Sequence, residues 1–202
     1  RAVVVAGDRA QLAAGLSALA QGSAGVDVAT GRVGEGALAI LFTGQGSQRA
    51  GMGRELYARS APFRAALDVV FTAFDRVLPE HLSTRMFAPE GSAEAAELEQ
   101  TLYAQPALFA LEVALYRLLE ACGVRAAYLL GHSLGELVAA HVSGVLTLED
   151  AVLLVAARAR AMQALGPGGA MAAVDASESE LRDLIAGIGA AVEIAAINGP
   201  RA

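Results

Sequence analysis

A strand, a tight turn and a helix are predicted around residues 131–136, which read Gly-His-Ser-Leu-Gly-Glu. The turn follows a short apolar run at residues 126–130 and precedes a stretch compatible with a helix. A Gly-x-Ser-x-Gly pattern in this context is typical of a nucleophile elbow, in which two glycines let the backbone turn sharply and expose the serine hydroxyl. Amide N–H groups at the helix start can stabilise an oxyanion. Ser133 is therefore the leading candidate for a nucleophile.

The same residues also allow a purely structural interpretation. Ser133 and Glu136 have the S-x-x-E spacing of a helix capping box, in which both side chains satisfy free backbone donors. The pattern alone leaves both interpretations open, because short motifs recur by chance.

Composition predicts a folded protein and excludes several classes of function. Hydrophobic residues make up 55% of the 202 residues, aromatic residues only 5%, and there is no tryptophan, so the core must rest on Ala, Val and Leu. All 15 basic residues are arginine, which excludes Schiff-base and general-base chemistry by lysine. A net charge of -6 without a basic cluster argues against nucleic acid as a partner.

The single cysteine and the lengths of the apolar runs predict the setting of the protein. Cys122 is the only cysteine, so intramolecular disulfides and cysteine-rich metal sites are excluded and a reducing, cytoplasmic setting fits best. No apolar run approaches the roughly 20 residues that span a bilayer. We therefore expect a soluble protein without a membrane partner.

A second loop follows a strand predicted at residues 37–42, an apolar run typical of a buried parallel strand. The loop, residues 43–48, reads Thr-Gly-Gln-Gly-Ser-Gln and lies at the carboxyl end of that strand, where open α/β sheets bind ligands. It resembles a phosphate-binding loop only loosely, since the lysine is missing. A plain connection from strand to helix is the alternative.

Three long helices are predicted. The first covers residues 60–78. The second begins at Pro106 and stops at Gly123, and it carries a stripe expected to face the core. The stripe consists of Leu108, Leu111, Leu115, Leu118, Leu119 and Cys122.

The third helix, residues 148–165, is apolar on every side before Arg158, so we expect it to be buried. Arg158 and Arg160 are two residues apart and project from different faces. We expect one to face solvent and the other to meet an anion, with a salt bridge to a core carboxylate as the alternative.

The predicted fold class is α/β, a three-layer hydrolase-like core with a parallel sheet and a nucleophile elbow. Residues 1–36 form a small α/β linker unit with a strand at 2–6 and a helix at 9–20, and residues 37–166 form the large subdomain. We expect residues 167–202 to form the first part of a ferredoxin-like subdomain, which this sequence does not contain in full. Its predicted elements are a strand at 170–174, a helix at 177–185 and a strand at 191–197.

Six ordered motifs resemble the acyltransferase domain of modular type I polyketide synthases and the related malonyl-CoA:acyl-carrier-protein transacylases. They are Leu41–Gln48, Gly51–Gly53, Tyr103–Ala110, Gly131–Glu136, Arg158 and Asn198–Pro200. The resemblance covers residues 37–202 and implies that residues 1–36 are the linker preceding such a domain.

The resemblance implies acyl transfer in two steps through an ester on Ser133, from an acyl-CoA to the phosphopantetheine thiol of an acyl carrier protein, in polyketide biosynthesis. It implies oxyanion N–H groups from Gln45 and Leu134, and a bond from Arg158 to the carboxylate of a malonyl-type unit. Gln45, His132 and Asn198 complete the substrate-binding set, with His132 in an orienting role. No metal is implied, nor any cofactor besides the CoA thioester, and a ketosynthase is the expected neighbour.

One departure from the family pattern concerns the general base, a histidine that the family places well downstream. His81, His132 and His141 do not match it, and His141 lies about 12 Å along the helix from Ser133 at about 1.5 Å per residue. We therefore expect this chain to lack its base and to be weakly active alone. Leu134 and the Tyr103–Glu112 segment resemble malonyl-selecting members.

Two other functions remain open from the sequence. A serine thioesterase or hydrolase would use the same elbow, although it has no need of an arginine for a carboxylate. A non-catalytic linker or docking piece of a synthase is the second alternative.

Overall fold

The computed structural model describes residues 1–23, 25, 27–32, 34–165, 169–188 and 192–201. The chain forms two compact units, Arg1–Gln163 and Ala164–Ala202. The first unit contains helices and a small parallel sheet, which confirms the predicted α/β class.

The N-terminal residues form β1 (Ala2–Val4), α1 (Arg9–Ala20) and β2 (Val28–Thr30). The predicted strand is shorter than expected, the predicted helix is confirmed, and β2 is an addition that pairs antiparallel with β1. Asp8 caps α1 by accepting a hydrogen bond from the backbone N of Gln11 at 2.8 Å.

Two parallel strands position the candidate site. β3 (Ala39–Phe42) pairs with β4 (Tyr128–Gly131), and the register places Phe42 opposite Gly131. Both strands were predicted at these positions. Because parallel strands end at the same edge, the loops that follow Phe42 and Gly131 lie next to each other.

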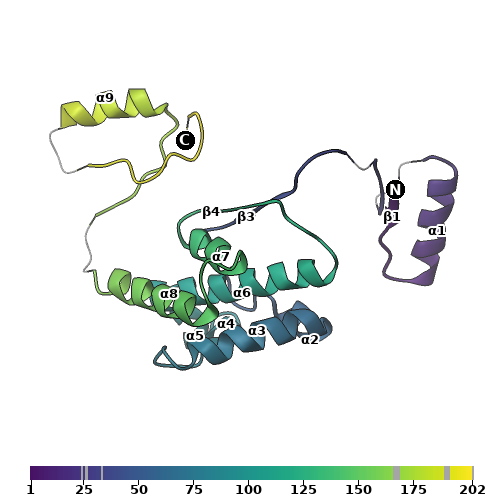
Figure 1. The fold of residues 1–202 in the computed structure, drawn as a ribbon, viewed down its shortest axis with the longest axis horizontal. Helices are drawn as coiled ribbons and strands as arrows, with labels where there is room; N and C mark the ends of the chain where they lie inside the picture. The colour runs from purple at the N-terminus through teal and green to yellow at the C-terminus, as the bar shows by residue number, and fades with distance from the viewer. Residues whose placement is uncertain (24, 26, 33, 166–168, 189–191, 202) are drawn as a thin grey trace. The chain divides into compact units, whose positions relative to one another are not determined.

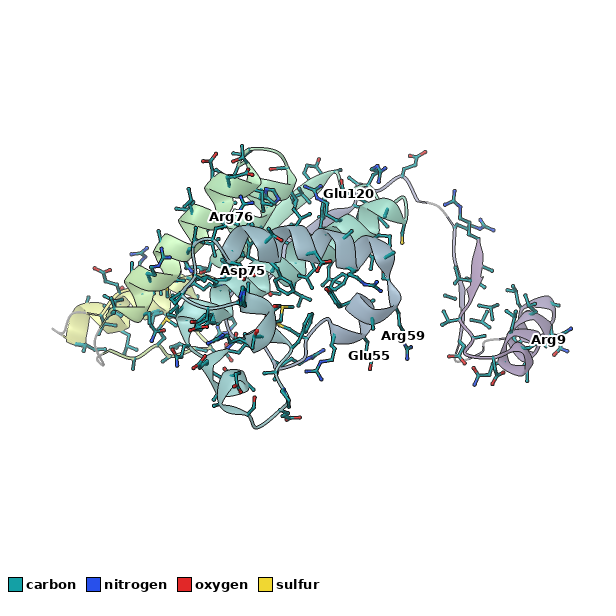
Figure 2. The ribbon with its side chains drawn as sticks, turned by 90° about the horizontal axis from the view of Figure 1, so that it is seen from below. Arg9, Glu55, Arg59, Asp75, Arg76 and Glu120 are labelled. Carbon is teal, nitrogen blue, oxygen red and sulfur yellow. The ribbon has the colours of Figure 1, made fainter. Side chains whose placement is uncertain are left out.

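Helices make up the rest of the first unit. They are α2 (Arg54–Arg59), α3 (Ala61–Phe74), α4 (Leu82–Met86), α5 (Ala93–Glu97), α6 (Thr101–Ala121), α7 (Leu134–Val142) and α8 (Leu148–Gln163). The central helix is α6, which packs against α3, α7 and α8 (Figure 1). On α2, Glu55 and Arg59 point away from the helical body (Figure 2). The largest fully buried side chains include Phe63, Phe74 and Phe109.

The start and the buried face of α6 differ from the prediction. The helix begins at Thr101 and contains Pro106 in its interior, although proline removes a backbone donor there. Residues 103–110 are all buried, and this packing outweighs the lost hydrogen bond. The helix ends at Ala121, and Cys122 is exposed rather than part of the core.

The predicted burial of the helix at 148–165 was wrong for one of its faces. Ala151, Val155 and Ala159 are buried, whereas Leu153 is 56% and Leu154 is 45% exposed. Arg160 is exposed and donates to the carbonyl of Val77, while Arg158 is half-buried. The prediction that the two arginines project from different faces is confirmed.

In the second unit, the predicted helix forms as α9 (Glu178–Ile188). The two flanking strand predictions were wrong: residues 170–174 and 192–197 are not in strands, and residue 191 lies outside the described residues. The apolar composition of these segments is not enough, because a strand also needs a hydrogen-bonded neighbour. Within the described ranges, no helix has both the length and the apolar character to cross a membrane.

Candidate active site

Ser133 occupies a sharp turn between β4 and α7. Its backbone angles are φ 56° and ψ -109°, and no other non-glycine residue described in the structure has a positive φ. L-residues rarely adopt such angles, which cost about 1–3 kcal/mol and persist only where the surroundings impose them. The turn therefore has the geometry expected of a nucleophile elbow.

Gly131 and Gly135, two residues before and after Ser133, permit this turn because neither position has room for a Cβ atom. A Cβ on Gly135 would lie 2.6 Å from the carbonyl carbon of Phe42 and 2.8 Å from the carbonyl oxygen of Thr43. A Cβ on Gly131 would overlap the backbone of Gly135 and Glu136. Both positions therefore require glycine so that β3, β4 and the start of α7 can approach one another.

The side chain of Ser133 does not cap α7. Ser133 is the N-cap residue, but its hydroxyl makes no capping hydrogen bond, and the capping-box alternative is therefore wrong. Its exposed Oγ instead accepts a hydrogen bond from Nη2 of Arg158 at 2.7 Å.

Arg158 projects from α8 toward Ser133 and is half-buried. Its Nη1 donates to Oε1 of Gln105, so the two ends of the guanidinium hold different side chains. Among the residues that the structure describes, no carboxylate pairs with Arg158, and the alternative of a core salt bridge is not realised. The guanidinium therefore lies beside the serine without a carboxylate partner among the described residues, and an anion of the substrate can bind it there.

Gln105 connects Arg158, through Thr101, to Gln45 in the loop at residues 43–48. Its side chain is fully buried in α6, and its Nε2 donates to Oγ1 of Thr101 at 2.7 Å. Thr101 in turn donates to Oε1 of Gln45 at 2.7 Å. Gln105 was not selected individually from the sequence. The signal that could have found it was a polar residue within a stretch that is otherwise apolar, since buried amides need partners.

The two predicted oxyanion donors lie on the two neighbouring loops. Gln45 is in the turn after β3, and Leu134 begins α7. Neither backbone N–H has an acceptor among the described residues. For Leu134 this is expected, because the first N–H groups of a helix have no partner within it. The side chain of Leu134 is fully buried, so only its backbone is available to the site.

A backbone hydrogen bond holds these loops together. The N of His132 donates to the carbonyl of Phe42 at 3.0 Å. A Cβ on Gly44 would lie 3.0 Å from Nδ1 and 3.2 Å from the carbonyl oxygen of His132, which shows how closely the loops approach.

The structure also places the predicted site residues His132 and Asn198, and His141, which was not predicted as a site residue. His132 is exposed and makes no hydrogen bond to Ser133 within the described part of the chain. His141 has its Nδ1 3.1 Å from the carbonyl oxygen of Leu146, and its ring lies 5.8 Å from that of Phe109. Burial lowers the pKa of the His141 imidazole. Asn198 is an exposed residue of the second unit, and its role stays a prediction.

Comparisons with a protein family, with curated proteins and with solved structures all identify one class of enzyme, which transfers acyl groups. The chain belongs to the acyl transferase domain family, which matches residues 40–202. It is 52% identical to the polyketide synthase GfsA of Streptomyces halstedii, over 100% of this chain and 3% of the synthase.

Two solved structures are also similar. The acyltransferase domain from the second module of the salinomycin polyketide synthase matches with a TM-score of 0.91 and 50% identity, over 100% of this chain and 46% of that chain. A malonyl-transacylase in complex with its type II polyketide synthase acyl-carrier protein (PlMCAT:AntF) gives a TM-score of 0.56 and 34% identity, over 66% of this chain and 41% of that one. The chain thus spans less than half of these two solved proteins.

Proposed function

We propose that this chain carries the nucleophile and the carboxylate-binding residue of an enzyme that moves a malonyl group from CoA to an acyl carrier protein. The single observation that carries the proposal is the hydrogen bond from Arg158 to Oγ of Ser133 in a strained elbow. The elbow supplies a nucleophile for a thioester, and the arginine supplies a charge for an acyl group that ends in a carboxylate.

In the first proposed step, Oγ of Ser133 attacks the thioester carbonyl and loses its proton, and the backbone N–H groups of Gln45 and Leu134 stabilise the oxyanion. The C–S bond then breaks, and the CoA sulfur takes up the proton that Ser133 has lost, so that CoA leaves as its thiol. In the second step, the phosphopantetheine thiol of the carrier protein attacks the seryl ester and regenerates Ser133. No cofactor takes part, and we assign no general base among the described residues.

Arg158 supports a malonyl-type acyl group on grounds of distance and charge. The carboxylate of a malonyl ester is separated from the ester carbon by one methylene group, and Nη2 of Arg158 already lies 2.7 Å from the hydroxyl oxygen that would become the ester oxygen. A guanidinium binds a carboxylate through two parallel hydrogen bonds, which a simple acetyl group cannot accept. The choice of malonyl over a branched unit rests on the resemblance alone, since Leu134 presents only its backbone to the site.

The partners and the setting form part of the same proposal. An acyl carrier protein as acceptor is supported by the similar transacylase, whose structure was solved with its carrier. We also propose a neighbouring ketosynthase, since the chain is similar to segments of polyketide synthases. We place the reaction in the cytoplasm, because the exposed free thiol of Cys122 suits a reducing compartment.

Substitutions of two arginines on α8 test this function, measured on the natural full-length protein with a carrier-protein thiol as acceptor. Arg158→Ala should lower kcat/KM for malonyl-CoA by about 10², because a bidentate charged pair is lost. With acetyl-CoA the same change should have little effect. Arg160→Ala is the matched control and should leave both substrates within about threefold.

Two results would contradict the proposal. Equal losses with both substrates would make Arg158 a structural residue. Release of malonate to water in preference to the carrier thiol would indicate a thioesterase instead.

A further inference from the structure

Glu112 is a buried carboxyl group on the face of α6 that also carries Gln105. Glu112 is 9% exposed, and Gln105 and Glu112 are the only buried polar or charged residues among those described. The two are seven residues apart and therefore lie on the same face of the helix, about 10 Å from each other along its axis. A carboxyl group in such a position costs free energy unless it is hydrogen-bonded.

One oxygen of Glu112 receives two hydrogen bonds from a single residue of the loop after β3. Its Oε1 accepts from the backbone N of Thr43 at 2.9 Å and from Oγ1 of Thr43 at 2.6 Å. Oε2 is buried and has no hydrogen-bond partner among the described residues. Burial raises the pKa of the Glu112 carboxyl, and the bonds from Thr43 oppose that shift.

The bond to Thr43 reaches the nucleophile through one peptide group. The N–H of Thr43 and the carbonyl of Phe42 belong to the same peptide bond, and that carbonyl accepts from the N of His132 at 3.0 Å. His132 immediately precedes Ser133. The peptide is therefore held on one side by α6 and on the other by the elbow, and its plane can turn only if a hydrogen bond breaks.

Helix α6 also contacts the loop after β3 at a second residue, Gln45. Thr101, whose hydroxyl accepts from Gln105, donates to the side chain of Gln45. The N–H of Gln45 is one of the two proposed oxyanion donors. Glu112 holds the loop two residues earlier, at Thr43. Helix α6 thus contacts the loop on both sides of Gly44.

We propose that Glu112 is a positioning residue, which fixes the Thr43–Gln48 loop so that the N–H of Gln45 points to the oxyanion formed at Ser133. This inference rests on the proposed function. Glu112 does not touch the substrate, and it acts through Thr43 alone. The alternative is that Glu112 only satisfies backbone groups of the core.

Single-turnover acylation of Ser133 in the full-length protein distinguishes these possibilities, because it separates the rate constant at saturating malonyl-CoA from the half-saturating concentration. Glu112→Leu removes the acceptor and should slow acylation by about 10², comparable with the loss of one oxyanion donor. The half-saturating concentration should stay within about threefold, because the carboxylate contact of Arg158 is unchanged.

Three further variants sharpen the test. Glu112→Gln keeps an oxygen acceptor and should recover most of the rate. Thr43→Val keeps the backbone bond to Glu112 but removes the hydroxyl bonds to Glu112 and to Oγ of Ser47. It should slow acylation by about tenfold, while Thr43→Ser should not. Glu120→Gln is the control on α6, since Glu120 pairs with Arg117 and has no contact with the loop.

The outcomes separate this inference from the proposed function. If Glu112→Leu does not fold, Thr43→Val decides: a slower rate supports the inference and an unchanged rate overturns it. If the folded variants acylate at the wild-type rate, or only the half-saturating concentration changes, the inference is wrong although the function stands. If the wild-type protein forms no seryl ester, both are wrong.

Discussion

Ser133 combines a backbone conformation that L-residues rarely adopt with a hydroxyl that receives a hydrogen bond from Arg158. Both features act on the same oxygen: the elbow exposes Oγ, and the guanidinium approaches it from α8. The strain of about 1–3 kcal/mol is retained because Gly131 and Gly135 let β3, β4 and α7 close around the turn.

His141 provides a test of local electrostatics at the scale of a single residue. Burial lowers the pKa of its imidazole, and the nearby carbonyl of Leu146 opposes that shift. In the unfolded chain the imidazole titrates near the ordinary histidine pKa of about 6.5, so around and below that pH the unfolded state binds more protons than the folded state. Stability should therefore fall as the pH falls from about 7.5 through 6.5 toward the folded pKa.

The measurement is urea unfolding of the wild type and of His141→Gln at several pH values. The wild type should lose more stability on acidification than the variant, because only the wild type has this imidazole to protonate. His81 and His132 are present in both proteins and contribute equally. Parallel pH profiles would show that His141 titrates alike in the folded and unfolded chains.

Single residues were predictable from the sequence where a local pattern fixes their surroundings. Ser133 lies in a motif whose two glycines dictate the turn, and Arg158 stands out as a charge in an apolar helix. Gln105 and Glu112 were not singled out, because their importance depends on loops that are more than 50 residues away in the chain. A local sequence pattern does not predict which distant loop a buried side chain will contact.

At the scale of elements, the strand–turn–helix from Tyr128 to Val142 depends on the close approach of three backbone segments. Gly135→Ala should cost about 3 kcal/mol or more, because the new methyl group would collide with the backbone of Phe42 and Thr43, which cannot move without shifting β3. Chemical denaturation gives the free energy of unfolding directly.

Gly187→Ala in α9 is the matched control. A Cβ there meets no atom within 4 Å, and alanine favours helix, so the change should be neutral or stabilising by about 1 kcal/mol or less. Similar free energies for Gly135→Ala and the wild type would mean that the elbow is looser than the described contacts imply.

Elements themselves were predictable where apolar runs and turn residues agree, as in β3, β4, α1 and α9. The errors arise where packing outweighs a local preference. Pro106 signals a helix start, but α6 begins at Thr101 because the residues around the proline are buried on all sides. Residues 170–174 have the composition of a strand, yet they are not in one, since the ladder partner is a property of the fold.

On the scale of the whole molecule, chain segments far apart in the sequence meet at one site. The loop after β3, the middle of α6, the elbow before α7 and the end of α8 supply Gln45, Gln105, Ser133 and Arg158. The α/β class and the parallel pairing could be predicted, because the apolar strands and the elbow are local features. The network that joins these residues could not, since it forms only when α6 and α8 pack against each other.

The central claim is that Ser133 carries the acyl group during transfer. Intact-mass spectrometry of the full-length protein after incubation with malonyl-CoA tests it most directly, with Ser133→Ala as the variant and Ser143→Ala, at the other end of α7, as the control. The wild type and Ser143→Ala should each gain one malonyl group, and Ser133→Ala should gain none. A malonyl adduct that survives in Ser133→Ala, or none on the wild type, would contradict this claim.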